Sequence, residues 1–319
     1  MKNIYYTSGI LKFGFCILYF AIFLFSTWGG YRGAAQQLPY YSQYMYSAFY
    51  INPAVAGSRE DIIPVMMTFR RQWAGFDDAP LTNTISGHAA LIKNMGFGAI
   101  LLDDRTGPLH QTGAQFTYAY HIKLKEDMKL GFGLGGMVYQ HVLNKGNFTI
   151  LDQNDNVIRG GKEKVVTPDA TFGIYFRTNR FFAGFSSPQL IENNMRFDEY
   201  ADLRLKMVRH YFLYSGYRIV INDEMEIIPS ALLKFVDGAP FQFDGNIRYD
   251  YKSRFWCGFS YRDKESVIGL AGFRAGNFAF GYSYDFTISN IKKYSSGSHE
   301  IFISFDVTKK RNKSVASFD

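Results

Sequence analysis

The sequence predicts an all-β fold: a transmembrane, antiparallel, up-and-down β-barrel of about fourteen strands, with about twelve as the other possibility. Three observations predict it. Aromatic residues make up 18% of the chain, with 31 Phe and 23 Tyr, whereas charged residues make up 20%. Apolar residues alternate with small or polar ones in many segments. Every second connection between these segments is short.

The N-terminus has the features of a secretory signal. Lys2 precedes an apolar run, Ile10–Phe25, which is interrupted only by Lys12, and small residues near Ala35 supply a cleavage site. We therefore expect residues 1–35 to be a signal peptide, with a retained membrane helix as the alternative. Only Cys257 remains after such cleavage, which excludes an internal disulfide in the mature chain.

Residues 36–61 form an aromatic strip before the first predicted strand. Within it, Gln43–Gly57 reads QYMYSAFYINPAVAG, with four aromatic residues and no charge. The strip is too short to span a membrane as a helix, and Pro53 breaks it. We therefore expect it to be buried at the periplasmic mouth of the barrel, either as a structural plug or as a docking element for a partner.

Period-two alternation is clearest in Asn277–Phe286, where five aromatic residues share one face and small or polar residues share the other. A soluble sandwich would also show one apolar face, but the aromatic content and the strand lengths favour a membrane barrel. The predicted barrel covers residues 62–308, with strands near 62–75, 81–92, 95–103, 110–124, 128–141, 166–177, 180–188, 205–221, 224–236, 240–251, 255–262, 266–274, 277–286 and 298–308.

The connections predict the orientation of the barrel. Short turns follow residues 92, 124, 177, 221, 251 and 274, whereas the intervening connections include the long segments 142–165, 189–204 and 287–297. Outer-membrane barrels have short periplasmic turns and longer outer loops, so both mature termini are expected in the periplasm. The basic tail 309–319 would then be periplasmic as well.

Charged and polar residues within the predicted strands are expected to face the lumen or the rims, because a lipid-facing charge at the bilayer midplane costs about 2–4 kcal/mol. A paired, hydrated interior is favoured over a ligand path. The residues concerned are Arg70, Arg71, Gln72, Asp103, Lys234, Asp244, Arg248, Arg262 and Asp263.

The sequence contains no pattern that predicts catalysis. No two of the six histidines have the spacing of a zinc pair, and no G-x-S-x-G motif marks a serine hydrolase. Gly131–Gly136 alternates as a strand does, which indicates a small-residue face where close packing or a plug needs room, not a phosphate loop. Basic residues are scattered among acids despite a net charge of +7, which argues against nucleic-acid binding. No catalytic, cofactor-binding or metal-binding residue is therefore predicted.

Blocks along the whole mature chain resemble the PorP/SprF family of type IX secretion and gliding-associated outer-membrane proteins. They include Gln36–Ser58, Phe69–Gly75, Gly96–Pro108, Glu226–Tyr249, Trp256–Arg262, Gly281–Ser289 and Ser295–Asp306. One departure is Ser47-Ala48, where the family often has Asn-Pro. The resemblance implies a non-enzymatic outer-membrane barrel of Bacteroidota-type bacteria. Its partners would be type IX secretion components and a secreted surface adhesin as cargo, besides outer-membrane lipid.

Two functions remain open at this point. The first is a component that supports secretion or surface attachment of large adhesins, or that couples the outer membrane to the periplasmic ring. The second is a porin-like or hydrophobic-solute uptake channel; an enzyme would need a Ser or His site that the pattern does not supply. The candidate partner-docking residues are Tyr44, Tyr46, Phe49, Tyr50, Asn52, Pro53 and Gly57, with Arg70, Arg71, Gln72 and Trp73 as an anchor on the first strand.

Overall fold

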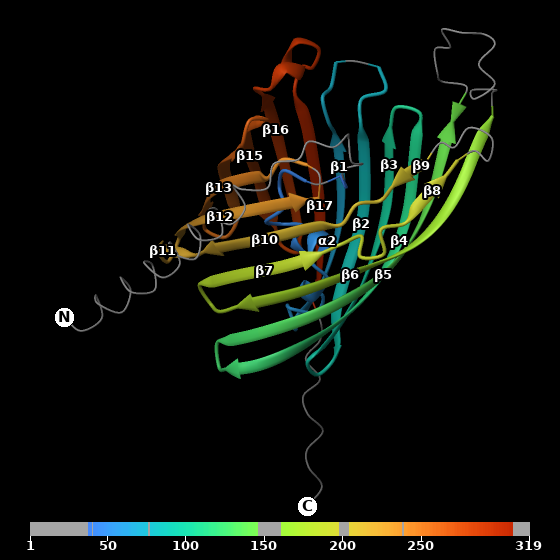
Figure 1. Cartoon of the computed structure of the whole chain (residues 1–319). Coiled ribbons are helices and arrows are strands. Elements are labelled where there is room, and N and C mark those ends of the chain that lie inside the picture. The colour runs from blue at the N-terminus through green and yellow to red at the C-terminus, as the bar shows by residue number, and fades with distance from the viewer. Residues whose placement is uncertain are drawn as a thin grey trace, which may run out of the picture.

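A computed structural model describes residues 38–39, 41–75, 77–145, 161–197, 204–237 and 239–308. The expected signal peptide, the tail 309–319 and most of the connection 142–165 lie outside the described residues. Figure 1 shows long strands that curve around a short central helix, α2 (Ala48–Ile51). The described residues contain no helix that is long and apolar enough to cross a membrane.

The wall consists of antiparallel strands joined in chain order. They are β1 (Ile62–Arg71), β2 (Leu81–Ile92), β3 (Met95–Thr106), β4 (Leu109–Lys125), β5 (Met128–Asn144), β6 (Lys162–Arg177), β7 (Phe181–Ser187), β10 (His210–Tyr217), β11 (Ile219–Asn222), β12 (Met225–Val236), β13 (Gln242–Tyr251), β14 (Phe255–Arg262), β15 (Ser266–Ala275), β16 (Phe278–Thr287) and β17 (Ser298–Thr308).

Pairing between the first and last strands closes the sheet. β10 and β11 pair with the same neighbour, β12, on either side of Arg218, so together they form one wall strand. β10 also pairs with β7, and β1 pairs with β17, which completes a closed barrel of fourteen strands. The predicted fold class is confirmed in its fourteen-strand form.

Three strand ends differ from the sequence-based expectation by four or more residues. β1 ends at Arg71, not near residue 75, because Trp73 has a φ of 52° that turns the chain. β6 begins at Lys162, four residues earlier than expected. β10 begins at His210, not near residue 205, because β9 (Arg204–Lys206) pairs instead with β8 (Asn194–Arg196) in a separate two-stranded sheet.

Side chains along the strands alternate between a polar interior and an apolar outer surface. In β4, Gln115 and Thr117 are 6% and 4% exposed, whereas the intervening Phe116 is 74% exposed. The same contrast recurs around the wall, with Leu134, Ile247 and Phe259 on the outside. Apolar rings on an outer surface are stable in lipid and costly in water, so the alternation fits a barrel that spans a membrane.

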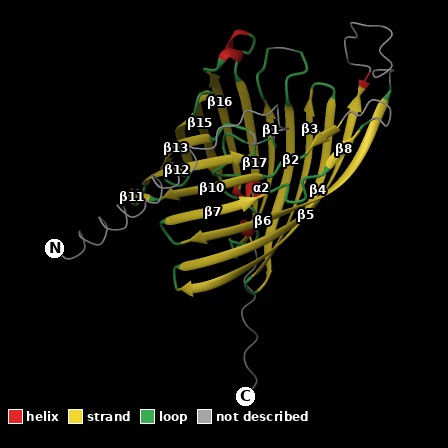
Figure 2. Ribbon diagram, viewed as in Figure 1, coloured by secondary structure: helices red, strands yellow, loops and turns green. Residues whose placement is uncertain are grey.

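The two ends of the barrel differ in their connections. Turns of two or three residues join the strands at one end, which we call the turn end. The opposite end, the loop end, includes the connections 145–161, 188–209 and 288–297, the last of which contains η4 (Asn290–Lys293). Figure 2 shows η4 as the red helix above β16. This alternation is the one that the sequence predicts.

The β8–β9 hairpin folds inward at the loop end. Met195, Phe197 and Met207 are at most 3% exposed. They form a cluster with wall residues of β3 and β5 that face the lumen: Leu102, Met137, Tyr139 and Leu143. Part of the connection expected to reach outward therefore closes the lumen instead.

Residues 41–61, which we call the luminal segment, run lengthwise through the barrel. The Leu38 nitrogen lies 3.4 Å from Nε2 of His210, the first residue of β10 at the loop end. The luminal segment then passes through α2 and η1 (Pro53–Val55) and joins β1 at the turn end. Because Thr308 ends β17 at the turn end, Leu38 and Thr308 lie at opposite ends. The expected mature termini, Gln36 and the tail 309–319, lie outside the described residues, so their common periplasmic location stays a prediction.

Glycines on the wall let the luminal segment pack directly on the strands. A Cβ added to Gly133 of β5 would lie 2.2 Å from the nitrogen of Ala54, and one added to Gly173 of β6 would lie 2.1 Å from Oδ1 of Asn52. Gly96 of β3 meets the luminal segment in the same way. Heavy atoms cannot approach so closely, so only glycine fits at these positions.

Replacing Gly133 by Val should therefore displace the luminal segment from β5. We expect the free energy of unfolding, measured by urea titration of tryptophan fluorescence in detergent micelles, to fall by about 1–3 kcal/mol. Gly136→Val is the matched control, because a Cβ at Gly136 meets nothing within 4 Å. Equal stability of the two variants would contradict the close-packing argument.

Candidate functional site

The luminal segment is held near the loop end by a buried ion network. Arg70 of β1 lies 2.7 Å from Oδ2 of Asp285 and 3.1 Å from Oε2 of Glu300. The backbone nitrogens of Ser42 and Gln43 donate to the two carboxylate oxygens of Glu300, at 2.6 and 2.9 Å. Glu300 therefore receives donors from the wall and from the luminal segment together.

The Ser42 hydroxyl is the centre of this network. It donates to Asp285 at 2.8 Å and accepts from Arg70 at 2.8 Å and from Arg262 at 3.3 Å. Arg262 in turn lies 3.0 Å from Oδ2 of Asp244. We call Ser42 with these four charged residues and Glu300 the latch. Its members come from β1, β13, β14, β16, β17 and the luminal segment, so it ties five wall strands to one serine.

Tyrosines of the luminal segment make the next contacts. Tyr41 donates to Oγ1 of Thr84 at 3.0 Å, and Tyr44 lies 3.2 Å from the hydroxyl of Ser230. Both rings are at most 2% exposed. The two hydroxyls therefore attach the luminal segment to β2 and β12.

Tyr46 occupies an aromatic and cationic environment nearer the turn end. Its ring centroid is 5.0 Å from those of Trp256 and Phe302, and the guanidinium of Arg248 lies 4.7 Å above it. Such a cation–π contact contributes about 0.5–2 kcal/mol, depending on desolvation. Tyr46 therefore joins the luminal segment to β13, β14 and β17.

Asn52 is fully buried and uses both ends of its amide. Its Nδ2 donates to the carbonyls of Ile174 and Phe185, at 2.9 and 3.3 Å, and lies 3.2 Å from the hydroxyl of Tyr214. Its Oδ1 accepts from the nitrogen of Ala54 at 2.9 Å. This side chain caps η1 while joining it to β6, β7 and β10.

At the turn end the chain leaves the lumen through a glycine turn. Gly57 has a φ of 68°, and a Cβ there would lie 2.5 Å from Cα of Gly96. The Gly57 nitrogen donates to Nδ1 of His88 at 3.1 Å, and Nε2 of His121 lies 2.7 Å from the carbonyl oxygen of Ala56. Both histidines thus hold backbone groups of the luminal segment.

The structure brings together most, but not all, of the residues proposed from the sequence. Of the expected anchor on β1, only Arg70 contacts the luminal segment. Arg71 is exposed on the outer face, and Gln72 and Trp73 lie in the connection to β2, where the Trp73 nitrogen donates to Ser298. Tyr44, Tyr46, Phe49, Tyr50, Asn52, Pro53 and Gly57 all lie within the barrel.

Sequence reasoning missed the two carboxylates that complete the latch. Asp285 and Glu300 lie at inward positions of β16 and β17 and are at most 2% exposed. The available signal was the alternation in Phe278–Phe286, where Asp285 shares the small-residue face. An acid on the face opposite the rings must lie in the lumen and needs a cation, and Arg70 was the inward-facing candidate.

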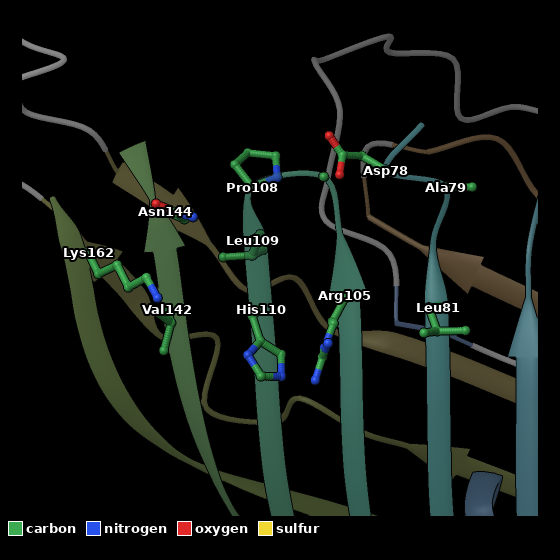
Figure 3. A pocket seen from close by; sticks show the side chains of 11 residues that line it. Asp78, Ala79, Leu81, Arg105, Pro108, Leu109, His110, Val142, Asn144 and Lys162 are labelled. Atoms are coloured by element: carbon green, nitrogen blue, oxygen red, sulfur yellow. The ribbon is translucent and has the colours of Figure 1, made fainter. Parts of the chain in front are cut away.

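A separate groove lies on the outer rim of the loop end. Its volume is about 510 Å³, and Figure 3 shows Arg105 and His110 on neighbouring strands that line it. Nε2 of His110 lies 2.5 Å from Oδ1 of Asp103 on the outer face. The luminal segment does not contribute to this groove, whose lining residues are Asp78, Ala79, Leu81, Arg105, Gly107, Pro108, Leu109, His110, Val142, Asn144 and Lys162.

The described residues hold no group of three or more His, Cys, Asp or Glu side chains with the geometry of a metal site. The hydroxyl of Ser42 is engaged by a carboxylate and two guanidiniums, not by a histidine base. The contacts described here therefore hold the luminal segment inside the barrel.

Replacing Arg70 by Leu should release the loop-end half of the luminal segment. Glu300 would lose its cation and Asp285 would keep only Arg262, at 3.6 Å, and breaking a buried pair in this way costs about 3–5 kcal/mol. We expect lower stability to urea and, in planar bilayers, a higher conductance than that of the parent protein. Arg71→Leu is the matched control, since Arg71 faces outward one residue away. Equal conductance of parent and Arg70→Leu would contradict the role of the latch.

Comparisons with known proteins agree with this fold. The chain is similar to the toluene transporter TbuX of Ralstonia pickettii, with a TM-score of 0.50 and 11% identity over 88% of this chain and 96% of that one. It is also similar to a Pseudomonas aeruginosa FadL homologue, with a TM-score of 0.47 and 12% identity over 81% of this chain and 92% of that one. A third similar structure is the CymD monoaromatic hydrocarbon channel, with a TM-score of 0.49 and 11% identity over 88% of this chain and 95% of that one. At 11% identity the likeness to TbuX shows the outer-membrane barrel fold alone.

No curated protein matches the chain. A family model described as "Type IX secretion system membrane protein PorP/SprF" matches residues 33–305, which include the luminal segment and nearly the whole barrel wall. The resemblance inferred from the sequence is thereby confirmed. The chain belongs to the PorP/SprF family of type IX secretion system membrane proteins.

Proposed function

We propose that this protein is a non-enzymatic outer-membrane component of the type IX secretion and gliding apparatus. In this proposal it supports the secretion or surface attachment of large adhesins, or couples the outer membrane to the periplasmic ring. The observation that carries the proposal is the occupied lumen: the luminal segment is bound along its length to the wall. A barrel filled by its own chain is suited to holding a partner and poorly suited to passing solutes.

The turn end faces the periplasm in this proposal, and the loop end faces outward. The loop-end connections, with the groove lined by Arg105 and Lys162, would then meet the cargo. The C-terminal tail would start in the periplasm, since Thr308 is at the turn end. On the same orientation Leu38 would lie on the outer side, since its nitrogen contacts His210 at the loop end.

The alternative is an uptake channel for small or apolar solutes. The cavity beside Tyr50 and Phe212 has a volume of about 30 Å³, far below the range of about 300–1,000 Å³ typical of ligand sites. This part of the lumen is therefore too narrow for a solute, which argues against the channel. A channel would require the luminal segment to leave, and swelling of protein-containing liposomes in small sugars tests that requirement directly.

Affinity isolation from the native host tests the proposal. The tagged protein would be purified from detergent-solubilised outer membrane and its companions identified by mass spectrometry. We expect a large surface adhesin or subunits of the secretion ring to be recovered with it. Recovery of the barrel alone, in a form that conducts ions, would instead favour the channel.

Deleting residues 43–57 should abolish adhesin display while leaving protein in the outer membrane. The deletion removes the contacts of Tyr44, Tyr46 and Asn52 and empties the lumen, whereas the strands that cross the lipid are unchanged. Display would be measured by antibody labelling of intact cells, with Gly136→Val as the control and a gel-shift assay on unheated protein to verify the barrel. Normal display by a folded deletion variant would remove the luminal segment from the mechanism.

A further inference from the structure

A cavity of about 350 Å³ opens at the turn end, between the luminal segment and the wall. We call it the vestibule. Its volume lies within the range of about 300–1,000 Å³ found for ligand sites. Residues from β1, β2, β6, β13, β15, β16 and β17 line it, and the luminal segment contributes residues from Met45 to Arg59. These wall residues face the interior, so lipid tails do not reach the cavity.

Four arginines line the vestibule, and the carboxylates around them are fewer. Asp306 is shared, at 3.2 Å from Arg59 and 2.9 Å from Arg274. Arg248 is paired with Asp250 at 2.7 Å. Arg177 is the fourth arginine, so four guanidiniums are accompanied by two carboxylates, those of Asp306 and Asp250.

Arg177 forms no ion pair within the described residues, although Glu60 lies near enough to interact with it electrostatically. Its Nη2 donates to the carbonyl oxygen of Ser58, and its Nε is buried without a hydrogen-bond partner. Nearby, Lys129 and Glu60 pair with each other and leave no net charge. The guanidinium of Arg177 lines the vestibule, where a carboxylate from outside would add an ion pair.

Aromatic rings lie between these cations. Tyr46, Phe49, Tyr175 and Phe302 all line the vestibule. The combination of guanidinium forks and ring faces suits a peptide in which acidic residues flank an apolar one, because Arg binds carboxylates with two parallel hydrogen bonds. The sequence after Thr308 begins Lys-Lys-Arg, so the residues that directly follow β17 add cations, and the first carboxylate side chain after them is that of Asp319.

We propose that the vestibule is a docking pocket for an acidic peptide segment of a partner protein. Charge complementarity carries this choice of occupant. The inference rests on the proposed function only in assigning the turn end to the periplasm, where such a partner would be located. Tyr46 and Phe49, two residues of the luminal segment proposed for docking, form part of this pocket. Through them a bound partner would contact the luminal segment directly.

Binding of labelled peptides to the purified full chain in a neutral detergent tests the proposal. The probe is a fluorescein-labelled decapeptide of Asp, Glu, Phe and Gly, and the reference is the same peptide with Asn and Gln replacing the acids. Fluorescence anisotropy should show saturable binding of the acidic peptide alone, weakened by 0.5 M salt, as expected for charge pairing. Equal binding of the neutral peptide, or no saturable binding of either, would overturn the proposal.

Variants locate the site. Arg177→Gln and Arg274→Gln, singly and together, keep an amide in place of each guanidinium, and the double variant should raise the Kd by about tenfold, which corresponds to about 1.4 kcal/mol. Arg105→Gln in the outer rim groove is the matched control and should leave the Kd unchanged. Each variant is first checked for the gel shift of a folded barrel. An unchanged Kd in a folded double variant, or an equal loss in Arg105→Gln, would overturn the assignment.

Inorganic phosphate serves as the competitor. A peptide pocket should retain the acidic peptide in 10 mM phosphate. It should also bind acidic peptides of the same charge that lack Phe more weakly. Displacement by phosphate, with equal affinity for every acidic sequence, would show a plain anion site and refute the peptide proposal. The assay uses no host component, so its failure leaves the proposed secretion role intact, whereas an isolation experiment without partners would count against that role alone.

Discussion

The contact between Glu300 and the luminal segment is the constraint on which the rest of the lumen depends. A fully buried carboxylate is stable only if its oxygens are satisfied, and here two backbone nitrogens and Arg70 satisfy them. Two consecutive backbone nitrogens point at one carboxylate only if the chain passes at that height and in that direction. The latch therefore sets the register of everything that follows in the luminal segment.

Beyond the latch, packing contacts rather than ion pairs hold the luminal segment. The luminal segment carries no charged side chain before Arg59, and from Tyr46 on it is held by ring contacts and by the amide of Asn52. Near the turn end its backbone lies on glycines of β3 and β5. Ion pairs and hydrogen bonds hold the luminal segment near the loop end, and close packing holds it near the turn end. Ion pairs are not used where backbone touches backbone, because no space is left for a charged side chain and its partner.

The barrel could be predicted from the sequence to a high degree, and the path of the luminal segment could not. Alternation in segments such as Asn277–Phe286 reports which face of a strand is apolar, and that is local information. The small-residue face at Gly131–Gly136 indicated a close contact without naming what made it. Ser42 gave no signal, since a serine beside a glutamine has no distinguishing pattern until the fold brings Glu300 and Asp285 to it. The same limit explains why Arg71 was grouped with Arg70: one residue along a strand reverses the face.

The latch also has a consequence for how the molecule comes to be assembled. Arg70 belongs to the first wall strand, whereas Asp285 and Glu300 belong to the last two, and β1 and β17 meet at the seam that closes the sheet. The ion network therefore straddles the closing seam. Its contacts cannot all exist before the final hairpin has arrived, although the chain that they hold precedes every strand. The contacts of Ser42 and Gln43 therefore form only after the last two strands are in place. The luminal segment is thus enclosed at the step that completes the wall.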